Sequence, residues 1–236
     1  MVVRWGSREQ SEWGPRASSH VQKLTFLFHP IPFSFDWQVC VTGANGQTGS
    51  YVIQKLFAAD EDSVTGIVRS EAAKKALVDK IGISEDKVVV SSYDAKSLEE
   101  CFQGCTKLII LTSSKPKLVF TSLFGVMFKK FVMRSEGAKP SFYFPEGQTP
   151  KDVDWLGQKA QIDAAKAAGI EHIVLIGSMG GTDPNHFLNT MGNGQILLWK
   201  RKAEVHLMKS GLKYTIIHPG GLVSLFLFSS LLCFGF

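Results

Sequence analysis

The 236-residue sequence has only four cysteines: Cys40, Cys101, Cys105 and Cys233. None of them stands in a Cys-x-x-Cys pair or beside a cluster of histidines, so the common zinc sites are excluded and no metal is expected. The sequence also lacks a secretory signal, which favours a reducing compartment. We therefore expect free thiols that lie mostly in the protein core.

A long uncharged run that could cross a bilayer is also missing. The last fifteen residues, LVSLFLFSSLLCFGF, carry no charge, but a membrane-spanning helix needs about 20 residues. His218, Pro219 and two glycines interrupt any extension of this run towards the N-terminus. We expect residues 222–236 to form an apolar tail that is not a membrane anchor.

Outside one segment the chain has no net positive charge. The formal net charge is +5, and seven basic and two acidic residues lie between Lys115 and Lys151, which leaves the rest of the chain neutral. This segment includes the Phe-rich stretch LVFTSLFGVMFKKFVM. A single basic insert at about residues 115–150 does not indicate a nucleic-acid-binding domain. Residues 1–37 have no periodicity and are interpreted as an irregular leader.

From residue 38 to residue 221, short β-branched runs alternate with helical stretches. Strands are expected at 39–43, 64–70, 87–94, 107–114, 172–178 and 213–221. Helices are expected at 47–59, 71–80, 97–102, 152–168 and 195–209. Apolar strands that alternate with helices indicate an α/β domain with a doubly wound parallel sheet, covered on both faces.

The stretch VTGANGQTGS joins the first expected strand to the first expected helix. Gly43 permits a tight turn, Gly46 lets backbone N–H groups approach a pyrophosphate, and Gly49 allows close packing of helix on strand. The helix N-terminus adds partial positive charge for the phosphates. A glycine-rich turn that binds nothing is the alternative. The residues expected to bind the cofactor here are Thr42, Gly43, Asn45, Gly46, Gln47, Thr48 and Gly49.

The ends of the next strands suggest which dinucleotide binds. Arg69 stands where an NAD-preferring protein has an acid, and a guanidinium suits a 2′-phosphate. NADP(H) is therefore expected in preference to NAD(H), unless Arg69 is only solvated. Asp94 is expected either to receive the adenine or to cap the following helix. Thr112 and Ser113 are expected either to line the ligand site or to serve only as turn residues.

These motifs, together with GIVRS, LIILTSS, DWLGQKAQIDAAKAAGIEHIVLIGSMGG, GNGQILLWKRKAE and YTIIHPGGL, resemble a known family. The chain is similar to atypical short-chain dehydrogenases/reductases, in particular to small plant NAD(P)-binding Rossmann proteins distantly related to the NmrA-like group. The resemblance covers about residues 39–222, apart from the Phe-rich stretch. It implies a parallel sheet of six or seven strands that binds NADP(H), and substrate specificity set by C-terminal elements that this sequence lacks.

The resemblance also implies catalytic roles. Ser178 matches the serine that would bond a substrate carbonyl, and Lys200 matches the lysine that holds the nicotinamide ribose and lowers the pKa of the proton donor. The tyrosine expected four residues before that lysine is replaced by Ile196. A turn that closes over the nicotinamide is matched by Pro219, Gly220 and Gly221.

Three interpretations of the function follow. The first is an NADPH-dependent oxidoreductase that acts on a carbonyl or quinone-like small molecule. The second is a catalytically inert, NADP(H)-responsive binding or regulatory module, and the third is a truncated, non-functional product. A nucleic-acid partner is not expected, and self-association is left open. The resemblance places relatives of this type in the chloroplast or the cytoplasm.

Overall fold

The computed structural model describes residues 38–60, 62–122 and 141–220. The expected leader at 1–37, most of the Phe-rich stretch and the apolar tail at 222–236 lie outside the described residues.

Six parallel strands form one sheet in the order β3-β2-β1-β4-β7-β8. Their bounds are Val39–Thr42 (β1), Val64–Val68 (β2), Val88–Val90 (β3), Lys107–Ile110 (β4), His172–Ile176 (β7) and Lys213–Ile217 (β8). The expected α/β fold with a doubly wound parallel sheet is thereby confirmed.

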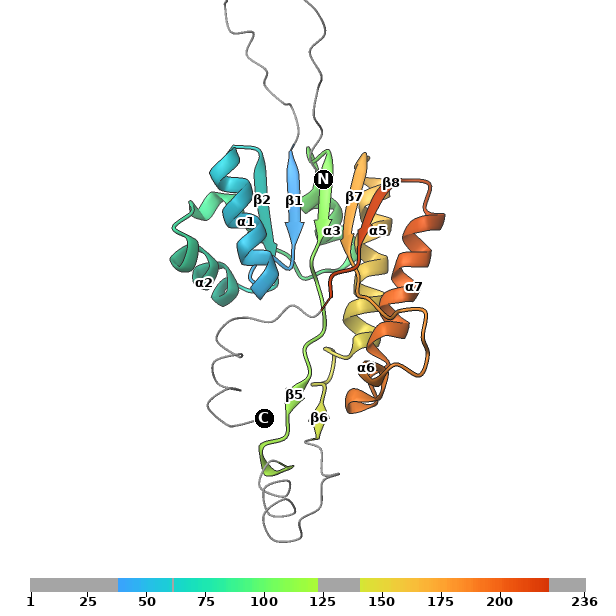
Figure 1. Ribbon diagram of the computed structural model, residues 1–236. Helices are drawn as coiled ribbons and strands as arrows, with labels where there is room; N and C mark the ends of the chain where they lie inside the picture. The colour runs from blue at the N-terminus through green and yellow to red at the C-terminus, as the bar shows by residue number, and fades with distance from the viewer. Residues whose placement is uncertain (1–37, 61, 123–140, 221–236) are drawn as a thin grey trace, which may run out of the picture. The chain divides into compact units, whose positions relative to one another are not determined.

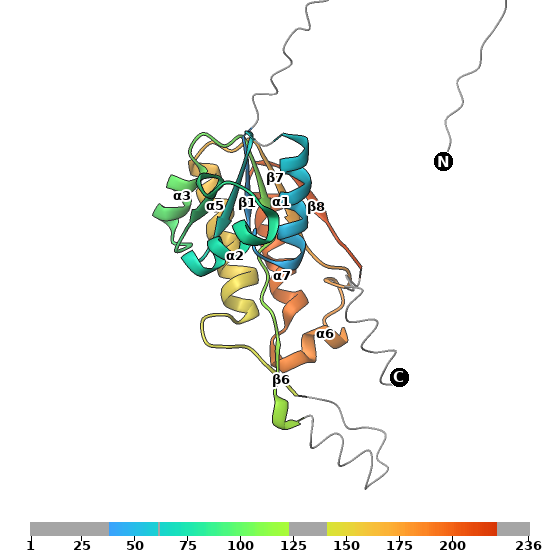
Figure 2. The same ribbon diagram turned by 90° about the vertical axis from the view of Figure 1, so that its left-hand side faces the viewer.

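Helices connect these strands and cover the sheet on both sides. The two helices on one face are α1 (Gln47–Ala59) and α2 (Glu71–Ile81). The other face carries α3 (Ala95–Phe102), α5 (Gln158–Ala167) and α7 (Ile196–Lys209) (Figures 1 and 2). The switch of face occurs where the chain leaves β3, at the edge of the sheet, and returns to β4 beside β1. The segments that follow β1 and β4 therefore run to opposite faces of the sheet, and ligands bind at this point in such folds.

Two apolar clusters lie on the two faces of the sheet. The first packs Leu98, Phe102, Ile162 and Leu207 from the helices of the α3 side against β-strand residues such as Leu108. The second packs Ile53 and Leu77, from α1 and α2, against Val41 and Val68 of the strands. All of these side chains are almost fully buried. Burial on both faces explains why the central strands read as continuous apolar runs.

Several shorter elements do not follow the predicted alternation. β5 (Lys117–Leu118) and β6 (Phe142–Tyr143) pair in a separate antiparallel ribbon. A π-helical segment, Lys151–Gly157, leads into α5, and α6 (Phe187–Thr190) precedes α7. Two single turns of 3₁₀ helix lie at Glu85–Lys87 and Met191–Asn193.

The expectation that all cysteines are free thiols is wrong for two of them, because Cys40 and Cys105 form a disulfide. Cys40 is the second residue of β1, and Cys105 lies in the loop that leads from α3 into β4. Pairing of β1 with β4 brings these positions together, with Cα atoms 6.2 Å apart, although 65 residues separate them in sequence. Cys101, in the last turn of α3, is a free thiol.

The edge of the sheet that ends in β8 is less covered than the other strands. Thr215 and Ile217 of β8 are exposed on the side of the sheet that carries α1. Within residues 38–60, 62–122 and 141–220, no helix packs over this part of the sheet (Figure 1). None of the helices in those ranges is long and apolar enough to span a membrane.

Candidate functional site

A cavity of about 660 Å³ opens at the carboxyl ends of β1, β2 and β4. Its walls come from the glycine-rich turn, the ends of these strands and the segment that leads into α5. Of the residues expected to bind a cofactor, nine line this cavity: Gly43, Asn45, Gly46, Gln47, Thr48, Gly49, Arg69, Thr112 and Ser113. Residues that are distant in sequence thus meet at the place that the strand order predicts.

The glycine-rich turn is packed too closely for side chains. Gly43 has φ +71°, and a Cβ on it would lie 2.8 Å from the carbonyl carbon of Leu111. A Cβ on Gly49 would lie 2.1 Å from Gly43 O, so α1 contacts the turn backbone directly. Gly46 N–H donates to Gly43 O at 2.9 Å and closes the turn. Gly43 and Gly49 therefore have no room for a side chain, whereas the approach of a pyrophosphate to Gly46 stays a prediction.

The N-terminus of α1 points its free backbone donors into this cavity. Gly46 is the N-cap and supplies no side-chain acceptor to the first turn. The first N–H groups of a helix have no partner within the helix, and the helix dipole adds positive potential there. The residues of this turn fit the pyrophosphate of a dinucleotide, since an anion completes donors that the protein leaves open.

Tyr93, in the loop between β3 and α3, supports this turn, although the sequence did not predict it as a site residue. Its hydroxyl accepts a hydrogen bond from Gly43 N–H at 3.1 Å and donates to Ile67 O at 3.4 Å. Burial raises the pKa of Tyr93 to about 12, so the hydroxyl stays neutral. Tyr93 also lines the cavity and has φ 63°, a left-handed backbone conformation. The only sequence signal was an aromatic residue directly before Asp94 at the end of a strand.

Arg69 and Asp94, which the sequence predicts to bind the adenosine part of the cofactor, differ in their surroundings. Arg69 follows β2, is exposed, and lines the cavity beside Tyr93. No acidic partner of Arg69 is found in the described part of the chain, which leaves its guanidinium open to an anion. Asp94 caps α3, because its Oδ1 accepts Ser97 N–H at 3.0 Å. The side chain of Asp94 does not line this cavity.

Polar side chains on α5 and on the π-helical segment before it form another wall of the cavity. Gln158 and Gln161 are each only 1% exposed. Gln158 Nε2 donates to Thr112 O at 2.8 Å, and Gln161 Nε2 donates to Thr112 Oγ1 at 3.2 Å. Gln161 Oε1 accepts a 2.6 Å hydrogen bond from Thr42 Oγ1, so Thr42 is buried behind the cavity and does not line it. These contacts hold the carboxyl ends of β1 and β4 in register with α5.

Asp154 completes this set of polar side chains and forms a buried ion pair with Lys200. Lys200 Nζ lies 2.7 Å from Asp154 Oδ1, and the two side chains are 11% and 0% exposed. Oδ1 receives no well-aligned hydrogen bond, so the ammonium alone compensates it. Asp154 Oδ2 accepts hydrogen bonds from Ser114 N–H at 3.2 Å and Ser114 Oγ at 2.5 Å. Lys200 therefore supports the turn after β4, and it does not line the cavity itself.

The signal for these polar side chains is present in the sequence. Asp154, Gln158 and Gln161 are spaced four and three residues apart, which places them on one face of a helix. That same face is otherwise apolar, because Ile162 and Ala165 are fully buried. Polar residues at helical spacing on a buried face must find partners in the fold. Here their partners are the strand ends that form the cavity.

The remaining predicted residues gather at the ends of β7 and β8. Ser178 is half-buried and its Oγ donates to Met179 O at 3.3 Å. Pro219 O accepts Met179 N–H at 3.4 Å, which joins the two strand ends. Gly220 follows without lining the cavity, and Gly221 lies outside the described residues.

Glu204, four residues after Lys200 on α7, connects that helix to this region. Glu204 is 2% exposed, and it accepts hydrogen bonds from Arg201 and His218 at 2.8 Å each. Gly177 makes room for the pair, since a Cβ there would lie 2.2 Å from Glu204 Oε1. The end of β8 is thus anchored to α7.

The position of the missing tyrosine is apolar in the structure as well. Ile196 is the first residue of α7 and is 9% exposed. Its N-cap, Gln195, supplies no side-chain acceptor, and Asn189 Oδ1 accepts Leu197 N–H at 2.9 Å instead. No proton-donating side chain stands at position 196.

Taken with the strand order, this cavity defines a dinucleotide-binding Rossmann protein. A family model described as NAD(P)H-binding matches residues 43–224. The chain belongs to this NAD(P)H-binding family.

Two curated plant relatives support the assignment. Sanguinarine reductase of Eschscholzia californica is 48% identical over 192 residues, which cover 78% of this chain and 69% of the relative. An uncharacterised chloroplastic protein of Arabidopsis thaliana is 47% identical over 186 residues, which cover 78% of this chain and 53% of that protein. This chain therefore spans little more than half of the Arabidopsis protein.

Solved structures agree on the fold. A putative NAD-dependent epimerase/dehydratase from Bacillus halodurans superposes with a TM-score of 0.58 at 22% identity, covering 80% of this chain and 72% of that one. An NADPH-dependent quinone oxidoreductase from Escherichia coli, complexed with NADPH, superposes with a TM-score of 0.53 at 25% identity. The second superposition covers 83% of this chain and 53% of the other.

Proposed function

We propose that this chain binds NADP(H) in preference to NAD(H), and that it is the cofactor-binding part of an NADPH-dependent reductase. The observation that carries the proposal is a single cavity lined both by the first turn of α1 and by Arg69, which has no acidic partner among the described residues. The first suits a pyrophosphate and the second suits a 2′-phosphate.

The substrate class follows from what the nicotinamide end lacks. When bound, the reduced cofactor supplies a hydride. Reduction of a simple aldehyde or ketone also needs a proton at the carbonyl oxygen, and a positioned general acid contributes about 10²–10⁴-fold in rate. Position 196 holds an isoleucine, and the ammonium of Lys200 is paired with the Asp154 carboxylate. We therefore favour acceptors that need no positioned general acid. An iminium cation becomes a neutral amine when it takes up a hydride, and a quinone becomes a hydroquinone anion that takes its proton from water.

The names of the relatives are consistent with this chemistry. The relatives include a sanguinarine reductase, and the structural neighbours include a quinone oxidoreductase and a triphenylmethane reductase. Ser178, at the end of β7, is the side chain proposed to donate to a substrate oxygen, which would replace its present hydrogen bond to Met179 O. The chloroplast is the proposed compartment, because the Arabidopsis relative is described as chloroplastic.

Cofactor binding is tested before turnover. Calorimetric titration of the purified protein with NADPH and with NADH should show tighter binding of NADPH. Arg69→Ala removes charge-assisted hydrogen bonds worth about 1.5–3 kcal/mol, so NADPH should bind roughly 10- to 150-fold more weakly while NADH binding is unchanged. Lys75→Ala, at an exposed site on α2, removes the same charge away from the cavity and should have no effect. Equal affinity of the native protein for both dinucleotides would exclude the role of Arg69.

Turnover separates the reductase from an inert, NADP(H)-responsive binding module, which is the second candidate. NADPH oxidation is followed with a quinone, with sanguinarine as an iminium cation, and with an aliphatic aldehyde. The reductase predicts turnover of the first two and little of the third. The binding module is favoured by the isoleucine at position 196, and it predicts cofactor affinity with no turnover of any acceptor.

A further inference from the structure

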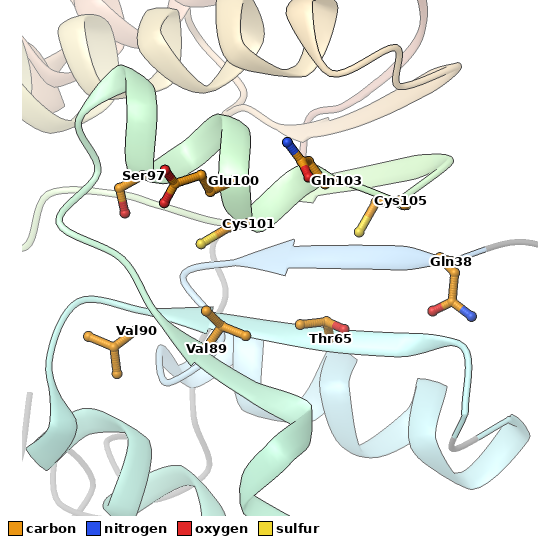
Figure 3. A pocket seen from close by; sticks show the side chains of 10 residues that line it. Gln38, Thr65, Val89, Val90, Ser97, Glu100, Cys101, Gln103 and Cys105 are labelled. Atoms are coloured by element: carbon orange, nitrogen blue, oxygen red, sulfur yellow. The ribbon is translucent and has the colours of Figure 1, made fainter.

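A second cavity lies apart from the dinucleotide site and contains a cluster of cysteines. Its volume is about 580 Å³, and Figure 3 shows the side chains that line it. It shares no lining residue with the first cavity. Cys101 and Cys105 both line it, and Cys105 is bonded to Cys40. The other lining residues are Gln38, Thr65, Val89, Val90, Ser97, Glu100, Gln103 and Gly104.

The two sulfurs of the disulfide differ in their access to this cavity. Cys40 is 0% exposed and is part of the apolar cluster beneath α3. Cys105 is half-buried and contributes to the cavity wall, in a loop between exposed Gln103 and Gly104 and the start of β4. A thiolate that enters the cavity can therefore reach Cys105 Sγ and not Cys40 Sγ. Thiol–disulfide exchange depends on such access.

The fold does not depend on this disulfide to hold the loop in place. Gln38 O accepts hydrogen bonds from Thr106 N–H at 2.8 Å and Lys107 N–H at 3.1 Å. β1 and β4 remain paired through the parallel ladder that begins at Val39 and Lys107. Opening the disulfide therefore leaves the strands paired, so reduction does not require unfolding.

Cys101 is a free thiol beside this disulfide. Burial raises the pKa of its thiol, and Ser91 and Ser97 lie within hydrogen-bonding reach of it. A protonated thiol is a poor nucleophile and is modified slowly. Cys101 therefore serves as an internal control that lines the same cavity.

We propose that Cys40 and Cys105 form a reversible redox site, opened and closed by a small-molecule thiol that enters the cavity at Cys105. In the reductive direction a thiolate attacks Cys105 Sγ and forms a mixed disulfide, and Cys40 leaves as a thiolate that takes up a proton. A second thiolate attacks the outer sulfur of the mixed disulfide and releases Cys105 as a thiolate, which is also protonated. Two small thiols are oxidised to one disulfide, and the protein disulfide gains two electrons and two protons.

The test counts thiols in the full chain, with Cys233→Ser introduced so that only three cysteines remain. The protein is equilibrated in glutathione buffers of graded ratio without denaturant. Exchange is stopped with acid, and the protein is then denatured and labelled with a maleimide for mass spectrometry. We expect one label at the oxidising end and three at the reducing end, with both new labels appearing together. Circular dichroism should show that the reduced form is folded, with a thermal midpoint lower by about 10 °C.

Two matched variants locate the transition. Cys101→Ser should keep the same redox midpoint, with no label in the oxidising buffer and two labels in the reducing buffer. Cys105→Ser should show two labels in every buffer, because Cys40 has lost its partner. Three labels in every buffer, one label until the protein is denatured, or a disulfide that maps to Cys101 would each overturn the proposal.

The point of entry is tested separately. Cys40→Ala leaves Cys105 without its partner, so oxidised glutathione should add one glutathione to Cys105 and none to Cys101. Addition at Cys101 in place of Cys105, or at neither, contradicts entry through the cavity. None of these outcomes depends on cofactor binding or turnover.

Discussion

Replacing Lys200 by methionine tests whether the family lysine has become a structural residue in this chain. Lys200 Nζ is 2.7 Å from Asp154 Oδ1, and Asp154 is completely buried. Methionine keeps the length and apolar stem of lysine but removes the charge. Asp154 would then be a buried carboxylate with hydrogen bonds only from Ser114.

The expected loss of stability is large. Removing one partner of a buried ion pair typically costs about 3–5 kcal/mol, because the remaining charge is left without compensation. For a urea m value of about 2 kcal/mol/M, a loss of about 4 kcal/mol moves the unfolding midpoint by about 2 M. The double variant Lys200→Met/Asp154→Leu removes both charges and should recover most of that loss.

Urea unfolding followed by circular dichroism measures these values, and the double variant closes a thermodynamic cycle. Lys202→Met is the matched control, since Lys202 is exposed two residues along α7 and its ammonium lies 4.7 Å from the ring centre of Trp155. This exposed contact is worth about 0.5–1 kcal/mol. If Lys200→Met unfolds at the same urea concentration as Lys202→Met, the structural role assigned to Lys200 is wrong. Loss of kcat at unchanged stability would instead indicate direct participation in the reaction.

Three further predictions concern the turn, the tyrosine beneath it and the disulfide. Gly49→Ala places a Cβ 2.1 Å from Gly43 O, so it should abolish dinucleotide binding in calorimetry and cost about 1–3 kcal/mol or more, whereas Gly46→Ala, at 3.1 Å from the same atom, should be milder. Equal effects would contradict the packing argument. For Tyr93, whose pKa rises from 10.0 to about 12 on folding, the neutral form is favoured in the folded state. Its stabilising contribution is complete below pH 10 and is lost as pH rises towards 12, so Tyr93→Phe should unfold with a weaker dependence on pH in this range, and an unchanged dependence would refute the assignment. Cys105→Ser removes the disulfide that closes a 65-residue loop, and it should lower the free energy of unfolding by about 4 kcal/mol in the chain-entropy model when compared with the oxidised protein. Compared with the reduced protein, the same variant should show no such loss.

Local patterns were enough to predict the sheet and the glycine turn. Each strand of the parallel sheet appears in the sequence as a short β-branched run. The glycines at positions 43 and 49 mark the turn, because its backbone conformation and close packing require residues without a side chain. The sequence placed the end of the first strand and the start of α1 within one residue of their positions in the structure. These features depend on neighbours in the chain, which is why sequence alone contains them.

The parts that were missed depend on contacts between distant residues. Tyr93 meets Gly43 across 50 positions, and Asp154 meets Lys200 across 46, so neither pair has a local pattern. The Cys40–Cys105 bond likewise follows from the pairing of β1 with β4. For Asp94, the sequence left two roles open, and only the three-dimensional structure shows its carboxylate bound to Ser97 N–H.

α3 lies close to both cavities: the dinucleotide cavity reaches Tyr93 just before the helix, and Ser97, Glu100 and Cys101 of the helix line the second cavity. The helix begins two residues after Tyr93, which contacts the glycine turn, and it carries Cys101 in its last turn, four residues before Cys105. Eight residues of helix span about 12 Å. If oxidation of the cysteine pair changes the affinity for NADPH by some factor, thermodynamic reciprocity requires saturating NADPH to change the equilibrium constant for disulfide reduction by the same factor. A tenfold effect would move the reduction potential by about 30 mV. The glutathione titration, repeated with NADPH, would therefore measure the coupling between the dinucleotide cavity and the cysteine pair.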